Sequence, residues 1–146
     1  MSTQPTASTV LAWARLFRAY KVLLEQAERD LKKAGLPPLS WYDVLLEVHD
    51  APAQRIRQFE LGQKVLLPKY NLSRLLDRLQ NEALLNREAC AEDKRGAVIT
   101  LTAKGRRLLK QMWSCYGATI HDRFEMRLDA KERDQLARVL LKLLPE

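Results

Sequence analysis

Cysteine, histidine and glycine are scarce in this chain of 146 residues, and each shortage argues against a class of function. Two cysteines, Cys90 and Cys115, cannot supply the disulfide framework of a small secreted protein. The two histidines, His49 and His121, are isolated and lack metal-site spacing with either cysteine. Five scattered glycines form no phosphate-cradling loop, and no nucleophile stands beside a base. The sequence therefore favours a protein that is not an enzyme and uses no metal or cofactor.

Long hydrophobic runs are missing as well. No stretch of about 18 apolar residues is present to span a membrane, and the first eight residues lack the apolar core of a secretory signal. Hydrophobic residues make up 47% of the chain, which is enough for the core of one compact domain. We therefore expect a cytoplasmic protein without membrane association that forms a single domain over residues 1–146.

Positive charge is plentiful, but it is concentrated in the middle of the chain. Residues 1–50 carry six Lys and Arg against six Asp and Glu, and residues 111–146 have the same balance. Residues 51–110 hold thirteen Lys and Arg against six Asp and Glu, so their excess equals the formal net charge of +7. A segment with this excess is suited to a polyanionic partner such as nucleic acid.

The basic middle segment begins with two short helices. The first is expected over residues 59–65, opened by Gln58. Its inward side chains are predicted to be Phe59, Leu61 and Val65. The second helix is expected to begin near Pro68 and has leucines at i, i+3, i+4 and i+7, which gives it one apolar face. These leucines are Leu72, Leu75, Leu76 and Leu79.

The opposite face of the second helix presents hydrogen-bonding and cationic side chains. They are Lys69, Tyr70, Asn71, Ser73, Arg74 and Arg78. Such a face, close to the positive end of the helix dipole, is suited to enter the major groove of DNA. Bidentate binding to adenine and contact with phosphate are both open for Asn71. For Arg78 the alternative is an ion pair with Asp77 that orients the helix.

An extended hairpin with a basic tip follows these helices. Strands are expected over residues 85–89 and 97–101, where Val98, Ile99 and Thr100 have high strand propensity. A third short strand over residues 55–57 is predicted to lie against this hairpin. Two helices and a hairpin in this order indicate a winged helix-turn-helix DNA-binding region over residues 53–102. The wing covers residues 89–96.

Helices flank this region on both sides, and the two ends of the chain, residues 1–50 and 111–146, carry no net charge. Thr9 is predicted to cap the first, which ends at Gly35, and Ser40 with Asp43 resembles the cap of a second, shorter helix. A long helix follows Thr102 as its N-cap. A final helix begins at a box formed by Asp129 and Glu132. We predict a mainly α (α+β) fold in which helices over residues 9–35 and 103–146 form a dimerisation region.

Three runs in the basic segment are similar to one protein family. Residues 72–80 (LSRLLDRLQ), 84–87 (LLNR) and 93–105 (DKRGAVITLTAKG) resemble the MarR family of bacterial transcriptional regulators. The resemblance covers roughly residues 39–144 in the right element order. It implies an obligate homodimer whose terminal helices interlock. The two winged modules would then meet a pseudo-palindromic operator in double-stranded DNA, about one helical turn apart.

The family pattern also implies residue roles. Ser73 stands where the family usually has Thr, and with Arg74 it is expected to contact phosphates or base edges. Arg95, at the wing tip, is expected to reach the minor groove. Asp93 would hold the guanidinium of Arg95 in place, and Lys94 would add a phosphate contact.

Regulators of this family commonly respond to a small aromatic molecule, and the resemblance extends that expectation to this chain as a repressor. The effector would be phenolic or an aryl carboxylate. Candidate contacts are Trp13, Phe17, Tyr20, Trp41, Tyr42, His49, Met112 and Tyr116. The alternative is that these side chains serve core and dimer packing.

Two other hypotheses stay open at this point. In the first, Cys90 beside the wing is a redox switch activated by the nearby Arg87. Peroxide-sensing members of the family place their cysteine near the start of the first helix, where this chain has none, and Cys115 has the setting of a packing residue. In the second, the protein is an architectural DNA-binding protein or an adaptor that needs no ligand.

Overall fold

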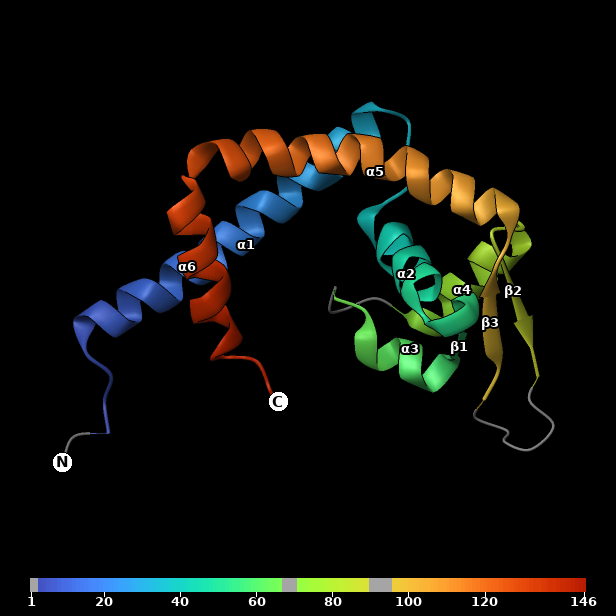
Figure 1. The fold of residues 1–146 in the computed structure, drawn as a ribbon, viewed down its shortest axis with the longest axis horizontal. Helices are drawn as coiled ribbons and strands as arrows, with labels where there is room; N and C mark the ends of the chain where they lie inside the picture. Colours follow the sequence, from blue (N-terminus) through green and yellow to red (C-terminus); the bar gives the residue numbers. More distant parts are fainter. Residues whose placement is uncertain (1–2, 67–70, 90–95) are drawn as a thin grey trace. The chain divides into compact units, whose positions relative to one another are not determined.

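Helices form both ends of the chain, and a small sheet lies between them in sequence (Figure 1). The structure is a computed structural model that describes residues 3–66, 71–89 and 96–146. Its helices and 3-10 turns are α1 (Ala7–Lys33), α2 (Leu39–Asp50), η1 (Pro52–Gln54), α3 (Gln58–Lys64), α4 (Leu72–Asn81), α5 (Ala103–Arg123), η2 (Glu125–Arg127) and α6 (Ala130–Leu141). Its strands are β1 (Arg55–Arg57), β2 (Leu85–Glu88) and β3 (Val98–Leu101). The mainly helical winged helix-turn-helix fold is thereby confirmed.

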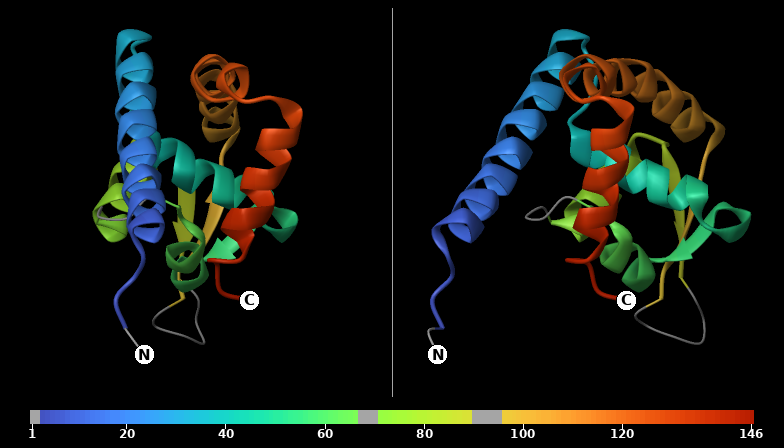
Figure 2. Two further views of the ribbon diagram at one scale, coloured as in Figure 1. Left: turned by 90° about the vertical axis from the view of Figure 1, so that its left-hand side faces the viewer. Right: turned by 60° about the vertical axis from the view of Figure 1, so that its left-hand side comes forward.

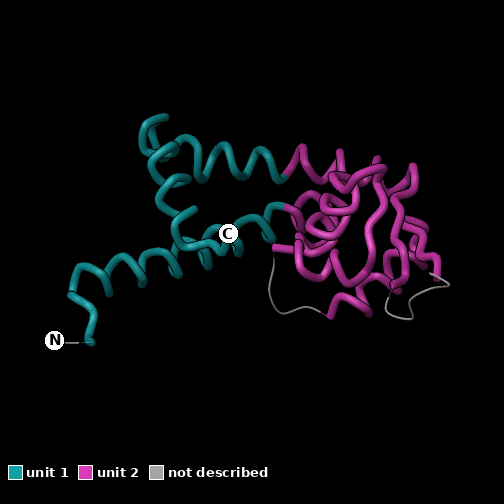
Figure 3. The backbone as a smooth tube through the Cα atoms, turned by 60° about the horizontal axis from the view of Figure 1, so that its bottom comes forward, with its two compact units in different colours: residues 1–30, 116–146 teal, residues 31–115 magenta. Residues whose placement is uncertain are grey.

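The chain divides into two compact units (Figure 3). One unit, here called the winged unit, contains residues 31–115, and the other, the terminal unit, contains residues 1–30 and 116–146. The boundaries fall inside α1 and α5, so each of these helices contributes to both units. Within the described ranges, none of the helices has the length and apolar character needed to cross a bilayer.

The sheet of the winged unit is antiparallel, with β3 in the centre between β1 and β2. Arg55 pairs with Thr100 on one side of β3, and Leu85 pairs with Leu101 on the other. The predicted third strand over residues 55–57 is confirmed, and the two hairpin strands are one residue shorter than expected. Side chains alternate across β1, so Ile56 is buried while its two arginine neighbours are exposed.

Fully buried side chains from every layer of the winged unit form its core. They are Leu31, Val44, Leu45, Val48, Leu61, Leu76, Leu79, Leu85, Ile99 and Met112. Phe59 was predicted to point inward, and this is wrong, because its side chain is 63% exposed. Successive residues of a helix are 100° apart, so Phe59 and Leu61 lie 200° apart and cannot both face the core. Leu61 occupies the inward position of this short helix.

Three predicted helix starts are wrong by a few residues. α1 begins at Ala7 and is capped by Thr6, not by Thr9 as predicted: the Thr6 hydroxyl accepts the Thr9 N–H at 3.2 Å. α2 begins at Leu39 after Pro38, with no side-chain cap, so Ser40 lies within its first turn. α4 begins at Leu72, not near Pro68, because the side chain of Asn71 caps it.

Other predicted helix ends are confirmed. Gly35 ends α1 in a left-handed conformation with a φ of 73°, which is the usual glycine stop. The Gly105 N–H donates to the Thr102 hydroxyl at 3.0 Å, so Thr102 caps α5. Asp129 and Glu132 form the expected reciprocal capping box of α6.

The terminal unit contains a long α1, which runs without interruption (Figure 2). Asp30 joins this helix to the C-terminal half of α5. Its carboxylate accepts hydrogen bonds from Gln26 Nε2 at 3.0 Å and from the buried Thr119 hydroxyl at 2.6 Å. A buried hydroxyl that donates to a carboxylate has its polar requirement met, so this contact sets how α1 and α5 meet within the unit.

The start of α5 lies unusually close to the turn that follows α4. Thr102 Oγ1 donates to the Ala83 carbonyl at 2.7 Å, and the Thr102 N–H donates to the Leu84 carbonyl at 3.2 Å. A Cβ atom on Gly105 would overlap the Leu84 carbonyl oxygen and lie 2.9 Å from Leu101 Cδ1. Only glycine allows this approach, which gives a physical reason for the Leu-Thr-x-x-Gly run noted in the sequence.

We expect Gly105→Ala to lower the free energy of unfolding by about 3 kcal/mol, because the clash is with backbone that cannot rotate away. Urea denaturation followed by circular dichroism measures this change. Gly62→Ala is the matched control, since a Cβ there would meet only Leu72 Cδ2 at 3.5 Å. The control should be neutral or up to about 1 kcal/mol more stable, because Ala favours the helix. Equal stability of both variants would contradict the argument.

Candidate nucleic-acid interface

α4 presents its two sides very differently. Leu76 and Leu79 are buried and the other two leucines are half-buried, so one side faces the core. At 100° per residue, Arg74, Asp77 and Asn81 lie at the centre of the opposite side. All three are exposed. Of these, Arg74 lies in the first turn, near the positive end of the helix dipole, where a cation does not favour the helix. The exposed position of Arg74 therefore fits binding of an external anion better than it fits stabilisation of the helix.

The N-terminus of α4 is organised by Asn71. Its side-chain Oδ1 accepts the Arg74 N–H at 3.1 Å, so Asn71 stands at the cap and not within the helix as predicted. The cap leaves the side-chain amide with N–H groups to donate. This favours phosphate over bidentate adenine as its partner, because adenine needs a donor and an acceptor together. Ser73, which is exposed, lies within the first turn.

On the side toward the sheet, α4 is tied to β2 by an ion pair between Asp77 and Arg87. Arg87 Nε also donates to Gln80 Oε1 at 3.3 Å. The partner of Asp77 is thus Arg87, not Arg78 as the ion-pair alternative held. The activation of Cys90 by Arg87 stays a prediction. Cys90 itself lies outside the described residues.

On the other side, α4 meets α2 through an arginine and an indole ring. The Arg78 guanidinium carbon lies 5.6 Å from the centroid of the Trp41 ring, which is within the range of a cation–π contact. The sequence assigned Arg78 to DNA and Trp41 to an effector. The structure brings them into direct contact.

α2 also supports the link between α3 and α4. The buried Asp43 accepts the Leu66 N–H at 3.0 Å, just beyond the end of α3. Partial burial raises the pKa of the neighbouring Glu47, and the nearby Asp43 and Asp50 carboxylates raise this pKa further, against a smaller lowering by Lys64. Glu47 is therefore a carboxylate whose charged form is disfavoured by the fold.

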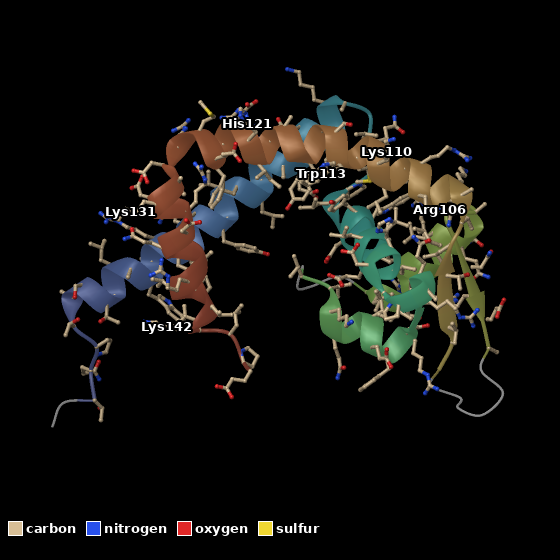
Figure 4. All side chains as sticks on the ribbon, in the orientation of Figure 1. Arg106, Lys110, Trp113, His121, Lys131 and Lys142 are labelled. Atoms are coloured by element: carbon tan, nitrogen blue, oxygen red, sulfur yellow. The ribbon has the colours of Figure 1, made fainter. Side chains whose placement is uncertain are left out.

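Several basic residues of the winged unit were not singled out by the sequence pattern. Arg55 and Arg57 are exposed on β1, where the alternation of RIR was an available signal. Arg106 and Lys110 project from α5 (Figure 4). Arg106 donates to Gln54 Oε1 at 3.3 Å and to the Leu101 carbonyl at 3.2 Å, and Lys104 Nζ donates to the Glu82 carbonyl at 2.8 Å. Arg106 and Lys104 therefore support the fold, whereas the β1 pair faces solvent.

Five predicted DNA contacts lie outside the described residues and stay predictions. They are Lys69, Tyr70, Asp93, Lys94 and Arg95. The structure thus places Asn71, Ser73, Arg74 and Arg78 along α4 and leaves the wing tip to experiment. Among the described residues, no group of His, Cys, Asp and Glu is arranged to hold a metal ion.

The predicted effector residues are divided between the two units. In the terminal unit Trp13 packs against Phe17, with ring centroids 4.8 Å apart, and Tyr20 and Tyr116 belong to the same unit. In the winged unit Tyr42 stacks on Trp113 at 6.3 Å, and His49 Nδ1 lies 3.0 Å from the Asp50 carboxylate. Burial of Tyr42 and Met112 supports the packing alternative for these two side chains. The effector role of the eight residues stays a prediction.

Comparison with known proteins identifies the winged segment and the fold. Residues 34–96 match the sequence model of the MarR family. AbsC, a MarR family transcriptional regulator from Streptomyces coelicolor, is 25% identical, with 97% of this chain and 95% of AbsC covered and a TM-score of 0.82. Sco3205, another MarR family regulator of that organism, solved in complex with DNA, is 24% identical, with 98% and 89% covered and a TM-score of 0.85. A mutant MarR from E. coli complexed with operator DNA is 24% identical, with 97% and 100% covered and a TM-score of 0.77.

The raised pKa of Glu47 predicts a pH-dependent gain on neutralising it. A carboxyl whose folded pKa lies above its unfolded value destabilises the fold at pH values above the folded pKa, and the penalty disappears below the unfolded pKa. We expect Glu47→Gln to be more stable than the native protein at pH 7, to lose this advantage as the pH falls toward about 4.5, and to have none below that pH. Thermal unfolding over this pH range measures it, with Glu60→Gln as a control for removing one negative charge. An advantage that grows toward low pH would refute the argument.

Proposed function

We propose that the chain is a homodimeric repressor of the MarR family, the family whose sequence model residues 34–96 match, and that it binds a pseudo-palindromic operator in double-stranded DNA. The observation that carries the proposal is the outward side of α4. Arg74 is exposed there beside the helix N-terminus, in a segment that holds the whole net charge of the chain. A basic helix face in this position is suited to read a major groove and to bind its phosphates. Two similar regulators have been solved with DNA.

Exposed apolar side chains of the terminal unit support the dimer. On α1, Val10, Trp13, Phe17 and Tyr20 follow one another at spacings of three, four and three residues, which places them on one face. Their side chains are between 47% and 65% exposed in the single chain. The C-terminal residues Val139, Leu141, Leu143 and Leu144 are also more than half exposed. Apolar surface of this extent is typical of an interface between subunits.

We further propose that a small aromatic anion releases the protein from its operator. The aromatic side chains of both units and the basic character of the chain support this ligand class. A screen of phenolic compounds and aryl carboxylates against the protein–DNA complex tests it, with release of the operator as the readout.

The DNA-binding proposal is tested on the fragment that the purified protein selects from random DNA. We expect Arg74→Ala to weaken binding to that fragment about tenfold and to lower the slope of log affinity against log salt by about one. Fluorescence anisotropy over a salt series measures both. Arg123→Ala, which removes an exposed arginine from the terminal unit, is the control for loss of one positive charge. Selection of no preferred fragment would favour an architectural DNA-binding protein instead.

The dimer proposal has its own test. A charge within the exposed stripe of α1 should separate the subunits, because the carboxylate would be buried without a partner. We expect the native protein to sediment as a dimer at micromolar concentration and Phe17→Glu to sediment as a monomer with unchanged helix content. Val22→Glu is the matched control: Val22 is 56% exposed on the same helix but lies on a different face from the stripe. A native monomer, or equal dissociation of both variants, would contradict the proposal.

A further inference from the structure

Two arginines at α4, Arg87 from β2 and Arg78 of α4 itself, have different partners. On the sheet side, Arg87 from β2 is paired with the Asp77 carboxylate, so the two charges cancel. On the α2 side, the Arg78 guanidinium lies over the Trp41 ring. Within the described part of the chain, Arg78 forms no ion pair with a carboxylate. An indole face orients a guanidinium without neutralising it, so Arg78 keeps its full charge.

We propose that Trp41 is a positioning residue for DNA binding: its ring holds the Arg78 guanidinium so that α4 presents a second, uncompensated cation to a DNA phosphate. This inference rests on the proposed function and adds to it a residue outside the helix-turn-helix. An arginine side chain has many rotamers in solution, and ordering them on binding opposes affinity. A guanidinium already held flat against a ring loses less of this freedom when it binds the phosphate.

The position of Arg78 on α4 agrees with this role. Arg78 follows Arg74 by four residues, so the two side chains lie on neighbouring parts of the same face, one turn apart. Arg78 belongs to the last turn, where a cation is compatible with the negative end of the helix dipole, and its side chain is exposed. The half-buried Trp41 lies in the first turns of α2, a helix whose buried residues belong to the core. A ring anchored in this way provides a fixed surface for the guanidinium.

The contact also bears on the earlier assignment of Trp41. The sequence predicted this ring as a contact for an aromatic effector. The guanidinium of the chain's own Arg78 lies over that ring, which serves the DNA-binding helix directly.

A double-mutant cycle on the DNA fragment selected by the native protein tests the inference. Arg78→Ala should weaken binding about tenfold and lower the salt slope by about one, since one phosphate contact is lost. Trp41→Leu should weaken binding by about three- to tenfold with an unchanged salt slope, because it removes orientation and no charge. The double variant should bind no more weakly than Arg78→Ala alone. Trp113→Leu, the same change at another tryptophan of the winged unit, should leave the affinity unchanged.

A conservative series and a measurement without DNA complete the test. Trp41→Phe should bind more tightly than Trp41→Leu, because phenylalanine keeps a weaker π face. If the leucine variant does not fold, Trp41→Phe is compared with the native protein, and it should bind more weakly with an unchanged salt slope. In the DNA-free protein, the Arg78 Nε–H resonance should be shifted by the ring current and should move to an ordinary position in Trp41→Leu. An unshifted resonance in the native protein would overturn the inference.

The outcomes separate this inference from the proposed function. If the native protein selects and binds no DNA, both are overturned. If the native protein binds its fragment but Trp41→Leu costs affinity equally with and without Arg78, the ring acts on something other than this arginine, and only the positioning role is lost. A reduced salt slope in Trp41→Leu would also overturn the positioning role. It would mean that the phosphate contact of Arg78 is lost altogether when the ring is removed, although the arginine is still present.

Discussion

The winged unit depends on the close approach between α5 and the turn that ends α4. Gly105 lies against the Leu84 carbonyl, while the Thr102 side chain caps α5 and donates to the Ala83 carbonyl. One short run of residues therefore joins the end of α4, the start of β2 and the start of α5. Because the close approach at Gly105 is to the backbone of Leu84, this junction leaves little room for adjustment.

Around that junction, α4 is supported on both sides, and the supports differ in charge. The Asp77–Arg87 pair neutralises itself on one side, whereas Trp41 orients Arg78 on the other without reducing its charge. Asp43 accepts a hydrogen bond from the Leu66 N–H in the link between α3 and α4. The winged unit thus combines rigid positioning of α4 with a net positive outward face. For a reader of DNA these two properties are needed together, since phosphate contacts position a protein and base contacts specify its site.

The terminal unit has the complementary character, with exposed apolar rows and almost balanced charge: residues 1–30 carry four Lys and Arg against three Asp and Glu, and residues 116–146 carry six of each. Asp30 and the buried Thr119 set how α1 meets α5 within that unit. Among the described residues, the side chains of the α1 stripe stay about half or more exposed, and this exposed surface is the basis of the proposed dimer. Charge and apolar surface are in this way distributed to different parts of one short chain.

The sequence by itself determined the order of helices and strands, the segment that carries the charge, and the helix ends at Gly35, Thr102 and Asp129. Each of these follows from residues that are neighbours in the chain: helical periodicity, strand propensity, caps and turns. The start of α1 failed because Thr6 and not Thr9 supplies the cap. The start of α2 failed because this helix follows Pro38 with no side-chain cap, and that of α4 failed because Asn71 caps it. The prediction for Phe59 failed because a short helix admits few inward positions.

The tertiary structure decided which charges meet. Asp77 pairs with Arg87 from β2, and Arg78 lies on Trp41, which belongs to α2 and precedes it by 37 positions. These partners become neighbours only when α2, α4 and β2 pack around a common core, and no spacing along the chain encodes that packing. The segment that carries the positive charge could therefore be predicted from the sequence. Which carboxylate pairs with each arginine, and which ring lies against it, depended on the fold.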